Sequence, residues 1–384
     1  MEGRPHFGRP FFPRTLCFFP HMKVHGLPTR SIRSLEGGES VEIIDQTLLP
    51  FRFERRVLTT WEDAVEAIRN MRVRGAPLIG ITGAWGVVLA LKTCHDNESL
   101  LKAAEVIRNA RPTAVNLSWA VTRMLGALLP REPKDRFFTA VRLAEEMTQE
   151  DVERCRRIGE AGLGVLRELY QKKRRPINVL THCNAGWLAT VDYGTALSPI
   201  YQAHDEGIPL HVWVEETRPR NQGLLTEWEL REHGVAHTLI VDNAGGHLMQ
   251  HGDVDAVIVG ADRITRRGDV ANKIGTYLKA LAAFDNGVPF YVAAPSSTVD
   301  WRLLSGRQEI EIENRGAEEV LGVHGMDKSG KPATVRLAPE GTPVANPAFD
   351  VTPSRLVTAF FTERGVFKPE DLYTGFADQL SAYQ

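Results

Sequence analysis

The sequence has few cysteines, and none are spaced to bind a metal together. Its 384 residues include four, Cys17, Cys94, Cys155 and Cys183, with no Cys-x-x-Cys motif among them. A disulfide framework or a zinc site would require paired cysteines, so neither is expected. The composition favours a cytoplasmic protein in a reducing environment, and no metal site is predicted.

A long apolar run is also absent. The longest candidate, Leu78 to Leu91, contains three glycines and is shorter than the roughly 18–20 residues that cross a bilayer. Neither sign of charge dominates, because 46 Lys and Arg residues against 48 Asp and Glu residues give a formal net charge of −2. We therefore expect no membrane partner and no broad basic surface for nucleic acid.

The glycine signatures of nucleotide binding are missing as well. Gly80, Gly83 and Gly86 lie in a helix-like stretch with no strand before it, so they are expected to allow close helix packing. No Walker motif occurs. A nicotinamide-dependent dehydrogenase would need the glycine fingerprint after its first strand, and its absence counts against that class.

The chain divides into a leader and two predicted domains. Residues 1–21 are rich in proline and aromatic residues and are interpreted as an unstructured leader. Residues 22–174 are predicted to form a mainly helical domain with a small antiparallel sheet between Val41 and Leu58. Helices are expected from Trp61, capped by Thr60, and in three further stretches. The last stretch reaches Lys173, with a cap-like break at Thr148 and Asp151.

Residues 175–384 are predicted to form a Rossmann-like α/β domain. Five short apolar runs follow Pro176, most of them separated by helix-like segments, which is typical of a doubly wound parallel sheet covered on both faces. The runs are Ile177–Leu180, Leu210–Val214, Thr238–Val241, Ala256–Val259 and Phe290–Ala293. The helix after Gln222 is predicted to start with a capping box of Thr226 and Glu229 and to end at Gly234.

Polar residues follow every one of these runs, where the fold places ligands. Cys183 follows the first run and Asp262 the fourth. Alone, a cysteine beside a strand is more often a small buried hydrophobe, and Asp262 is as often a helix cap or a partner for Arg263 as a reacting group. Their common position at strand ends favours a thiol–carboxylate pair. A helix after Asn184 would direct its positive end at the sulfur and favour the thiolate.

Three segments could bind an anion. Arg74-Gly75-Ala76 combines a guanidinium with a closely approachable backbone, Arg111 precedes a proline at a helix start, and Asn272-Lys273 is expected to open a helix. Taken individually, each basic residue is more often a solvated surface charge. His182, which has no metal-binding spacing, is interpreted as a residue that tunes or packs near the cysteine.

Taken together, these motifs resemble a known family. The chain is similar to the 5-methylthioribose-1-phosphate isomerases, relatives of archaeal ribose-1,5-bisphosphate isomerases and of regulatory subunits of the translation-initiation nucleotide-exchange factor. The resemblance extends from about Lys23 to Val366. It is carried by the segments Glu42–Pro50, Arg74–Gly80, Arg111–Leu117, Thr181–Gly186, Glu216–Gly223, Val259–Ile264, Asn272–Tyr277 and Asn346–Pro353.

The resemblance implies an aldose–ketose isomerase of methionine salvage. Its substrate would be 5-methylthio-α-D-ribose 1-phosphate, with Cys183 and Asp262 at the reacting atoms, no metal or organic cofactor, and a homodimeric assembly. The implied substrate contacts are Arg74, Gly75, Ala76, Arg111, Gln222, Asn272 and Lys273. Two alternatives stay open: an isomerase of ribose 1,5-bisphosphate, and a non-catalytic regulatory subunit, which need not keep the thiol–carboxylate pair.

Overall fold

The computed structural model describes residues 22–111 and 114–376. The leader expected over residues 1–21 lies outside the described residues. Among the described ones, no helix combines the length and the apolar character that crossing a membrane requires.

The first part of the chain forms a small antiparallel sheet, as predicted. Strands β3 (Ile32–Leu35), β4 (Ser40–Ile44) and β5 (Arg55–Leu58) pair in that order, and β1 (Lys23–Val24) and β2 (Leu27–Pro28) form a separate hairpin. The inward residues of β4 are Val41 and Ile43, which are buried against the neighbouring helices.

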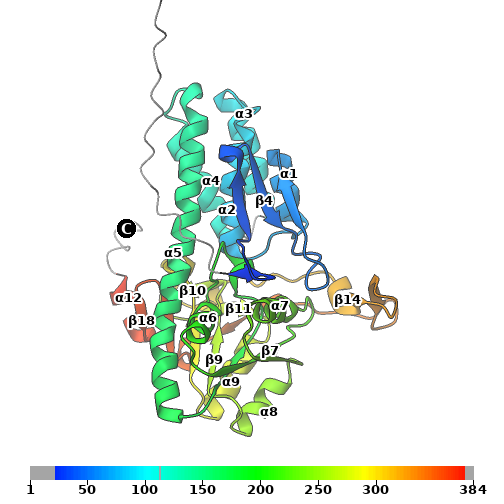
Figure 1. Ribbon diagram of the computed structural model, residues 1–384, viewed down its shortest axis with the longest axis vertical. Helices are drawn as coiled ribbons and strands as arrows, with labels where there is room; N and C mark the ends of the chain where they lie inside the picture. The colour runs from blue at the N-terminus through cyan, green and yellow to red at the C-terminus, as the bar shows by residue number, and fades with distance from the viewer. Residues whose placement is uncertain (1–21, 112–113, 377–384) are drawn as a thin grey trace, which may run out of the picture.

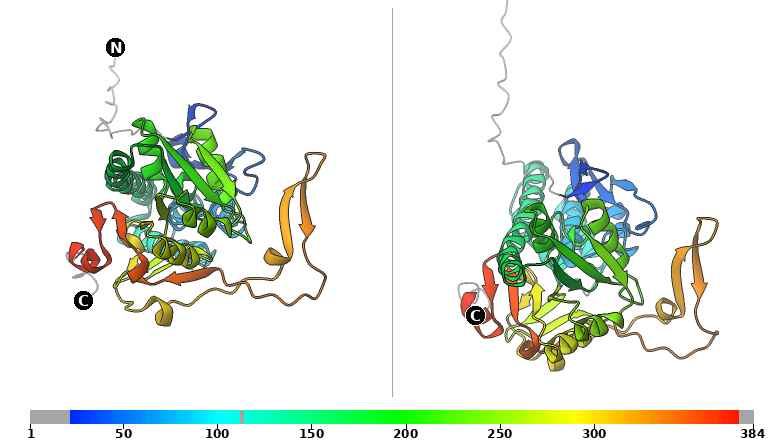
Figure 2. Two further views of the ribbon diagram at one scale, coloured as in Figure 1. Left: turned by 90° about the horizontal axis from the view of Figure 1, so that it is seen from below. Right: turned by 60° about the horizontal axis from the view of Figure 1, so that its bottom comes forward.

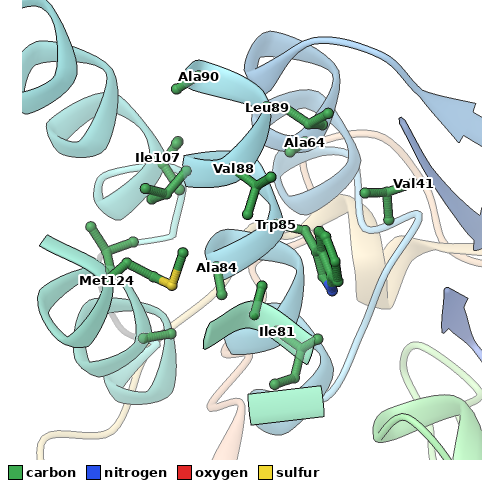
Figure 3. Close-up of a cluster of buried hydrophobic side chains, with 14 of the residues drawn as sticks. Val41, Ala64, Ile81, Ala84, Trp85, Val88, Leu89, Ala90, Ile107 and Met124 are labelled. Atoms are coloured by element: carbon green, nitrogen blue, oxygen red, sulfur yellow. The ribbon is translucent and has the colours of Figure 1, made fainter. Parts of the chain in front are cut away.

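Five helices follow this sheet. They are α1 (Trp61–Arg69), α2 (Ala76–Ala90), α3 (Asn97–Arg108), α4 (Val115–Leu128) and α5 (Pro133–Lys173). Thr60 caps α1 in a reciprocal capping box with Asp63, as expected for the first helix. Helix α2 is central, since every residue from Leu78 to Ala90 is buried, and its Trp85 and Val88 pack among the surrounding helices (Figure 3). The glycines of α2 do allow close helix packing, because a Cβ on Gly83 would lie 2.3 Å from Leu117 of α4.

Helix α5 runs unbroken for 41 residues along the molecule (Figure 1), so the predicted break at Thr148 and Asp151 is wrong. Both side chains are buried, where their polar atoms are satisfied without interrupting the helix. The Thr148 hydroxyl donates to the carbonyl of Ala144, and Asp151 accepts from the main-chain N–H of Val191. Residues that often cap helices here connect one helix to its neighbours.

The second half of the chain contains the predicted parallel sheet. Its seven strands are β6 (Ile177–Thr181), β7 (Leu210–Glu215), β8 (His237–Ile240), β9 (Ala256–Val259), β12 (Phe290–Ala293), β17 (Ala359–Thr362) and β18 (Gly365–Phe367). They lie in the order β18-β17-β12-β9-β6-β7-β8, and only β18 is antiparallel to its neighbour. All five apolar runs became strands of this sheet, which confirms the α/β doubly wound fold class.

Helices cover both faces of the sheet, because neighbouring residues of one strand point to opposite faces and lie in different hydrophobic cores. Val179 belongs to a core shared with α5, α6 (Ser198–Asp205) and α7 (Gly223–His233), whereas Leu180 belongs to a core shared with α8 (Ala244–Gln250) and α9 (Thr276–Asp285). The central strands β6, β9 and β12 are buried on both faces and carry mainly apolar side chains, whereas the edge strand β8 is partly exposed.

Two further β elements escaped the sequence analysis. Strands β10 (Arg263–Thr265), β11 (Val270–Lys273), β13 (Val299–Asp300) and β16 (Phe349–Thr352) form a four-stranded sheet beside the carboxyl edge of the large one. Strands β14 (Gly322–Met326) and β15 (Pro332–Arg336) form a hairpin that projects from the body of the molecule (Figure 2). Short polar strands of this kind have weak patterns.

Two glycines of α5 offer a matched test of this packing. A Cβ on Gly162 would lie 2.5 Å from Pro199 and 2.7 Å from Phe361, whereas one on Gly164 would meet nothing within 4 Å. Gly164→Ala should raise the free energy of unfolding by about 0.5–1 kcal/mol through helix propensity. Gly162→Ala should lower it by about 1–3 kcal/mol through overpacking. Urea unfolding measures both, and equal shifts would contradict the close contact between α5 and α6.

Candidate active site

A cavity of about 140 Å³ opens at the carboxyl edge of the seven-stranded sheet. All nine residues singled out in the sequence line it, although they come from segments far apart in the chain. They are Arg74, Gly75, Ala76, Arg111, Cys183, Gln222, Asp262, Asn272 and Lys273. The strand order explains the convergence, because β6 and β9 are neighbours at the point where the chain changes direction across the sheet.

Cys183 follows β6 in a strained backbone conformation. Its φ of 66° lies in the left-handed region, which costs a non-glycine residue about 1–3 kcal/mol. Two threonines support it: the N–H of Cys183 donates to Thr217 Oγ1 at 2.8 Å, and Thr226 Oγ1 donates to the carbonyl of Cys183 at 2.8 Å. The surrounding loops therefore determine where the thiol points.

Two local expectations at this loop are wrong. Asn184 is followed by a short 3-10 turn, Trp187–Ala189, and not by an α-helix directed at the sulfur. Helix α7 begins at Gly223, so Thr226 and Glu229 lie inside it and form no capping box, while Gly234 does end the helix. Glu229 instead accepts hydrogen bonds from Asn184 Nδ2 at 2.8 Å and from two main-chain N–H groups of the turn. It therefore holds in place the loop that contains Cys183.

Burial controls the ionisation of the two central groups. Burial raises the pKa of the Cys183 thiol to about 11, even though the nearby ammonium of Lys273 lowers that pKa. The Asp262 carboxyl lines the cavity and is otherwise surrounded by protein. This burial raises the pKa of Asp262, whereas the positive charges of Lys273 and Arg111 lower that pKa. The negative charge of Asp262 raises the pKa of the thiol further, so Cys183 is mainly protonated near neutral pH.

The lining of the cavity includes the first candidate anion-binding segment, Arg74-Gly75-Ala76. Gly75 has a φ of 82°, and a Cβ there would lie 2.2 Å from the carbonyl oxygen of Ala189, so only glycine fits. Burial, together with the nearby charge of Arg220, lowers the pKa of Arg74 to about 10. Arg74 Nε and Gln222 Oε1 are buried without a hydrogen-bond partner among the described residues. Unsatisfied polar atoms facing a cavity suit a polar ligand.

Asn272 and Lys273 occupy a different element from the one expected. They end strand β11, and helix α9 starts only at Thr276. Lys273 Nζ donates to the carbonyl of Ala348 at 2.9 Å and lies 4.1 Å from the centre of the Phe349 ring. Burial lowers the pKa of this ammonium, while Cys183 and Asp262 raise it. Lys273 is thus the buried cation shared by the thiol and the carboxyl.

Further cavity residues were missed by sequence reasoning. Arg220 and Phe349 lie within quoted motifs but were not singled out, and Arg315 belongs to a segment with little regular structure. Arg220 pairs with Glu319, and Arg315 Nε lies 3.0 Å from Glu313 Oε1. The available signals were the motif Asn346–Pro353 for Phe349 and the pair of arginines in Thr217-Arg-Pro-Arg220 for Arg220.

One group among the described residues has ligand atoms close enough together to hold a metal ion. His182, Glu215 and Asp242 present such atoms within 4.8 Å of one another. Lys279 Nζ lies 3.3 Å from Glu215 Oε2 and donates to the carbonyl of Asp242 at 2.6 Å. An ammonium group therefore already supplies positive charge at this position.

The fold and this cavity define a class of protein that comparison identifies. A family model described as "Initiation factor 2 subunit family" matches residues 72–369, and the chain belongs to this family. The resemblance inferred from the sequence motifs is thereby confirmed.

Individual relatives are more specific. The chain is 58% identical over 346 residues to a methylthioribose-1-phosphate isomerase of Methylobacterium nodulans, covering 90% of this chain and 95% of the relative. It resembles the crystal structure of 5-methylthioribose 1-phosphate isomerase from Pyrococcus horikoshii with a TM-score of 0.80 and 40% identity, over 92% and 96% of the two chains. A structure of the translation initiation factor eIF-2B subunit delta from A. fulgidus gives a TM-score of 0.76 and 41% identity, over 89% and 96%.

The environment of the thiol can be tested by alkylation. Because burial raises the pKa of Cys183 to about 11, iodoacetamide should modify it slowly at neutral pH and faster as the pH approaches that value. Lys273→Met removes the charge that lowers this pKa, so the rate at a given alkaline pH should fall. Peptide mass spectrometry follows the reaction, with buried Cys155 as the control. Rapid, pH-independent modification would contradict the assignment.

Proposed function

We propose that this protein is an aldose–ketose isomerase that converts 5-methylthio-α-D-ribose 1-phosphate into 5-methylthio-D-ribulose 1-phosphate in methionine salvage. The observation that carries the proposal is the pair of Cys183 and Asp262 at one end of a cation-lined cavity. The names of relatives that are more than half identical over nine-tenths of the chain support the same activity.

Ring opening is the first chemical requirement. A phosphate on the anomeric carbon blocks the spontaneous opening that free aldoses undergo, so a proton must be supplied to the ring oxygen as its bond to C1 breaks. Asp262 is assigned this role because burial raises its pKa, which keeps a proton on the carboxyl nearer to neutral pH. Arg74, Arg111 and Lys273 are assigned to the phosphate.

Hydrogen must then move from C2 to C1 while the C2 hydroxyl loses its proton. Cys183 could do this as a thiolate base through an enediol, or it could stabilise a direct hydride shift. The raised pKa of the thiol favours the hydride shift, since little thiolate is present in the free protein near neutral pH. Gln222, Asn272 and the backbone at Gly75 and Ala76 are assigned to orienting the sugar.

A second cavity supports the methylthio substrate over ribose 1,5-bisphosphate. It adjoins the first, has a volume of about 790 Å³ and shares Arg111 and Asp262 with it. Its lining combines apolar side chains, among them Ile79, Ile310 and Ile312, with the charged residues Arg263, Glu311 and Glu313. The three carboxylates Asp262, Glu311 and Glu313 outnumber the two arginines Arg111 and Arg263, which disfavours a second phosphate dianion, whereas an apolar 5-substituent fits beside the isoleucines.

Turnover is the direct test. Purified protein should convert 5-methylthioribose 1-phosphate to the ketose, detected by NMR, and should convert ribose 1,5-bisphosphate far more slowly. Cys183→Ser and Asp262→Asn should each lower kcat by about 10²–10⁴-fold, the usual contribution of acid–base groups. Both substitutions preserve side-chain size, so circular dichroism should be unchanged.

Other outcomes would replace the proposal. Conversion of ribose 1,5-bisphosphate alone would keep the reaction class and change the substrate. Inactivity on both sugars would favour a regulatory subunit and remove the assigned roles of Cys183 and Asp262.

The domain division and location are also proposed on this basis. Helix α5 ends at Lys173 and β6 begins at Ile177, which supports a helical domain over 22–174 and a sheet domain over 175–384. The helical domain contributes Arg74 to the cavity and would exclude water from it. Free thiols at Cys94 and Cys155 agree with a cytoplasmic protein.

We further propose a homodimer in which the β14–β15 hairpin contacts the second copy. One face of the hairpin is apolar, because Val323 pairs with Val335 and the ladder continues from Leu321 to Leu337. Val335 is 58% and Leu337 56% exposed, although an isolated two-stranded hairpin is only marginally stable in water. An apolar face on a projecting arm is expected to be covered in the assembly.

Sedimentation can test this arrangement. The wild type should sediment as a dimer, and Val335→Asp with Leu337→Asp should shift the population toward monomer by burying charge at the contact. Thr334→Asp is the matched control, since Thr334 lies on the opposite face of the same strand. A monomeric wild type would contradict the dimer, and equal behaviour of both variants would remove the hairpin from the interface.

A further inference from the structure

We propose that His182 is a doubly protonated positioning residue. It holds the turn that follows Lys273, at Ile274 and Gly275, against the loop that contains Cys183. Its role in turnover rests on the function proposed above, whereas its protonation can be measured independently. From the sequence alone, His182 is expected only to tune the cysteine or to pack near it.

The hydrogen-bond partners of the ring determine its protonation. Nδ1 lies 2.7 Å from Glu215 Oε2, and Nε2 lies 2.8 Å from the carbonyl oxygen of Ile274. A carbonyl oxygen only accepts, so Nε2 carries a hydrogen. Nδ1 also carries one if Glu215 is ionised, and Lys279 Nζ at 3.3 Å from the same carboxylate oxygen favours that state. The ring is then an imidazolium.

The charges around the ring agree with this assignment. Glu215 on β7, Asp242 after β8 and Asp350 on β16 are the carboxylates that face it, while Lys279 on α9 is the basic side chain. Glu215 is fully buried, and His182 is 1% exposed. Glu215 is the fully buried carboxylate of this cluster, while Asp242 and Asp350 are partly exposed, and a cationic ring beside Glu215 supplies a second positive charge next to Lys279.

The ring connects three loops that line the cavity. His182 precedes Cys183 and bonds Glu215, the last residue of β7, whose carbonyl accepts from the hydroxyl of Thr217. That hydroxyl oxygen in turn accepts the N–H of Cys183. On the other side, the ring holds the carbonyl of Ile274, which follows Lys273 directly.

The turn at Gly275 is shaped to fit the ring. Gly275 has a φ of 102°, and a Cβ there would lie 3.1 Å from His182 Cε1 and 3.2 Å from Nε2. The backbone therefore packs directly on the imidazole. Because Lys273 is the cation that most strongly lowers the pKa of Cys183, displacement of this turn would alter both the thiol and the sugar-phosphate contacts.

Two substitutions separate the two bonds of the ring. Asparagine places its amide nitrogen where Nδ1 lies, so His182→Asn keeps the bond to Glu215 and releases Ile274. Glutamine places its amide nitrogen where Nε2 lies, so His182→Gln keeps Ile274 and leaves Glu215 without this donor. Positioning predicts that kcat falls more in His182→Asn, by about 10²-fold, the loss typical of a misplacement near 1 Å. A role in stability alone predicts more damage in His182→Gln.

The protonation state gives a readout independent of activity. Nitrogen-15 spectra of imidazole-labelled protein near neutral pH should show both ring nitrogens of His182 bearing hydrogen, and Glu215→Gln should remove one of them. The signal is assigned by its loss in His182→Asn, and His211→Gln, at a partly exposed histidine bonded to Thr238, is the control for kcat.

Each outcome decides the proposal. A singly protonated His182 in the wild type would overturn it, as would His182→Asn with wild-type kcat, or His182→Gln as the less active variant, at equal folded fraction. If the wild type fails to isomerise the sugar phosphate while the ring is doubly protonated, the proposed function is wrong and the ion pair still stands.

Discussion

Charge burial at the carboxyl edge of the seven-stranded sheet is the constraint on which the site depends. Lys273 is buried beside a thiol and a carboxyl, and the Phe349 ring and the Ala348 carbonyl replace the water that its ammonium loses. A second buried network nearby consists of His182, Glu215 and Lys279. Because a buried charge without a partner is strongly destabilising, each of these groups restricts its neighbours, and the loops have little freedom to rearrange.

The parts of the fold that depend on hydrophobic pattern could be predicted from the sequence. The five apolar runs became parallel strands because burial on both faces leaves a continuous apolar signal. The break expected in α5 failed because Thr148 and Asp151 bond to partners distant in sequence, Trp85 and Val191, which no local pattern records. The four-stranded sheet escaped for a similar reason, since pairing between β11 and β16 joins segments about eighty residues apart. The β14–β15 hairpin pairs nearby segments, but its short strands lack a clear hydrophobic pattern.

The candidate site was predictable in its residues more than in its geometry. Strand ends and motifs pointed to nine residues, all of which line the cavity, because the topology brings strand ends to one edge. The local structure was inferred less well: the turn after Asn184 is not an α-helix, and Thr226 and Glu229 brace the cysteine loop instead of capping α7. The side chains that cap helices can also hydrogen-bond to a neighbouring loop. Sequence alone therefore favours helix capping, which is the commoner of the two roles. Arg315 carried no signal, because its position depends on the path of a long connection.

Fold similarity alone would leave the function of this chain open, since relatives of comparable TM-score carry the names of an isomerase and of an initiation-factor subunit. The chemistry of the cavity favours one of them. Strained backbone is found at ligand clamps as well as at active sites, so the positive φ of Cys183 marks a functional position without choosing between binding and catalysis. The thiol and carboxyl groups of Cys183 and Asp262 make that choice, because a protein that only binds a sugar phosphate does not require a proton donor and a thiol in the same cation-lined cavity.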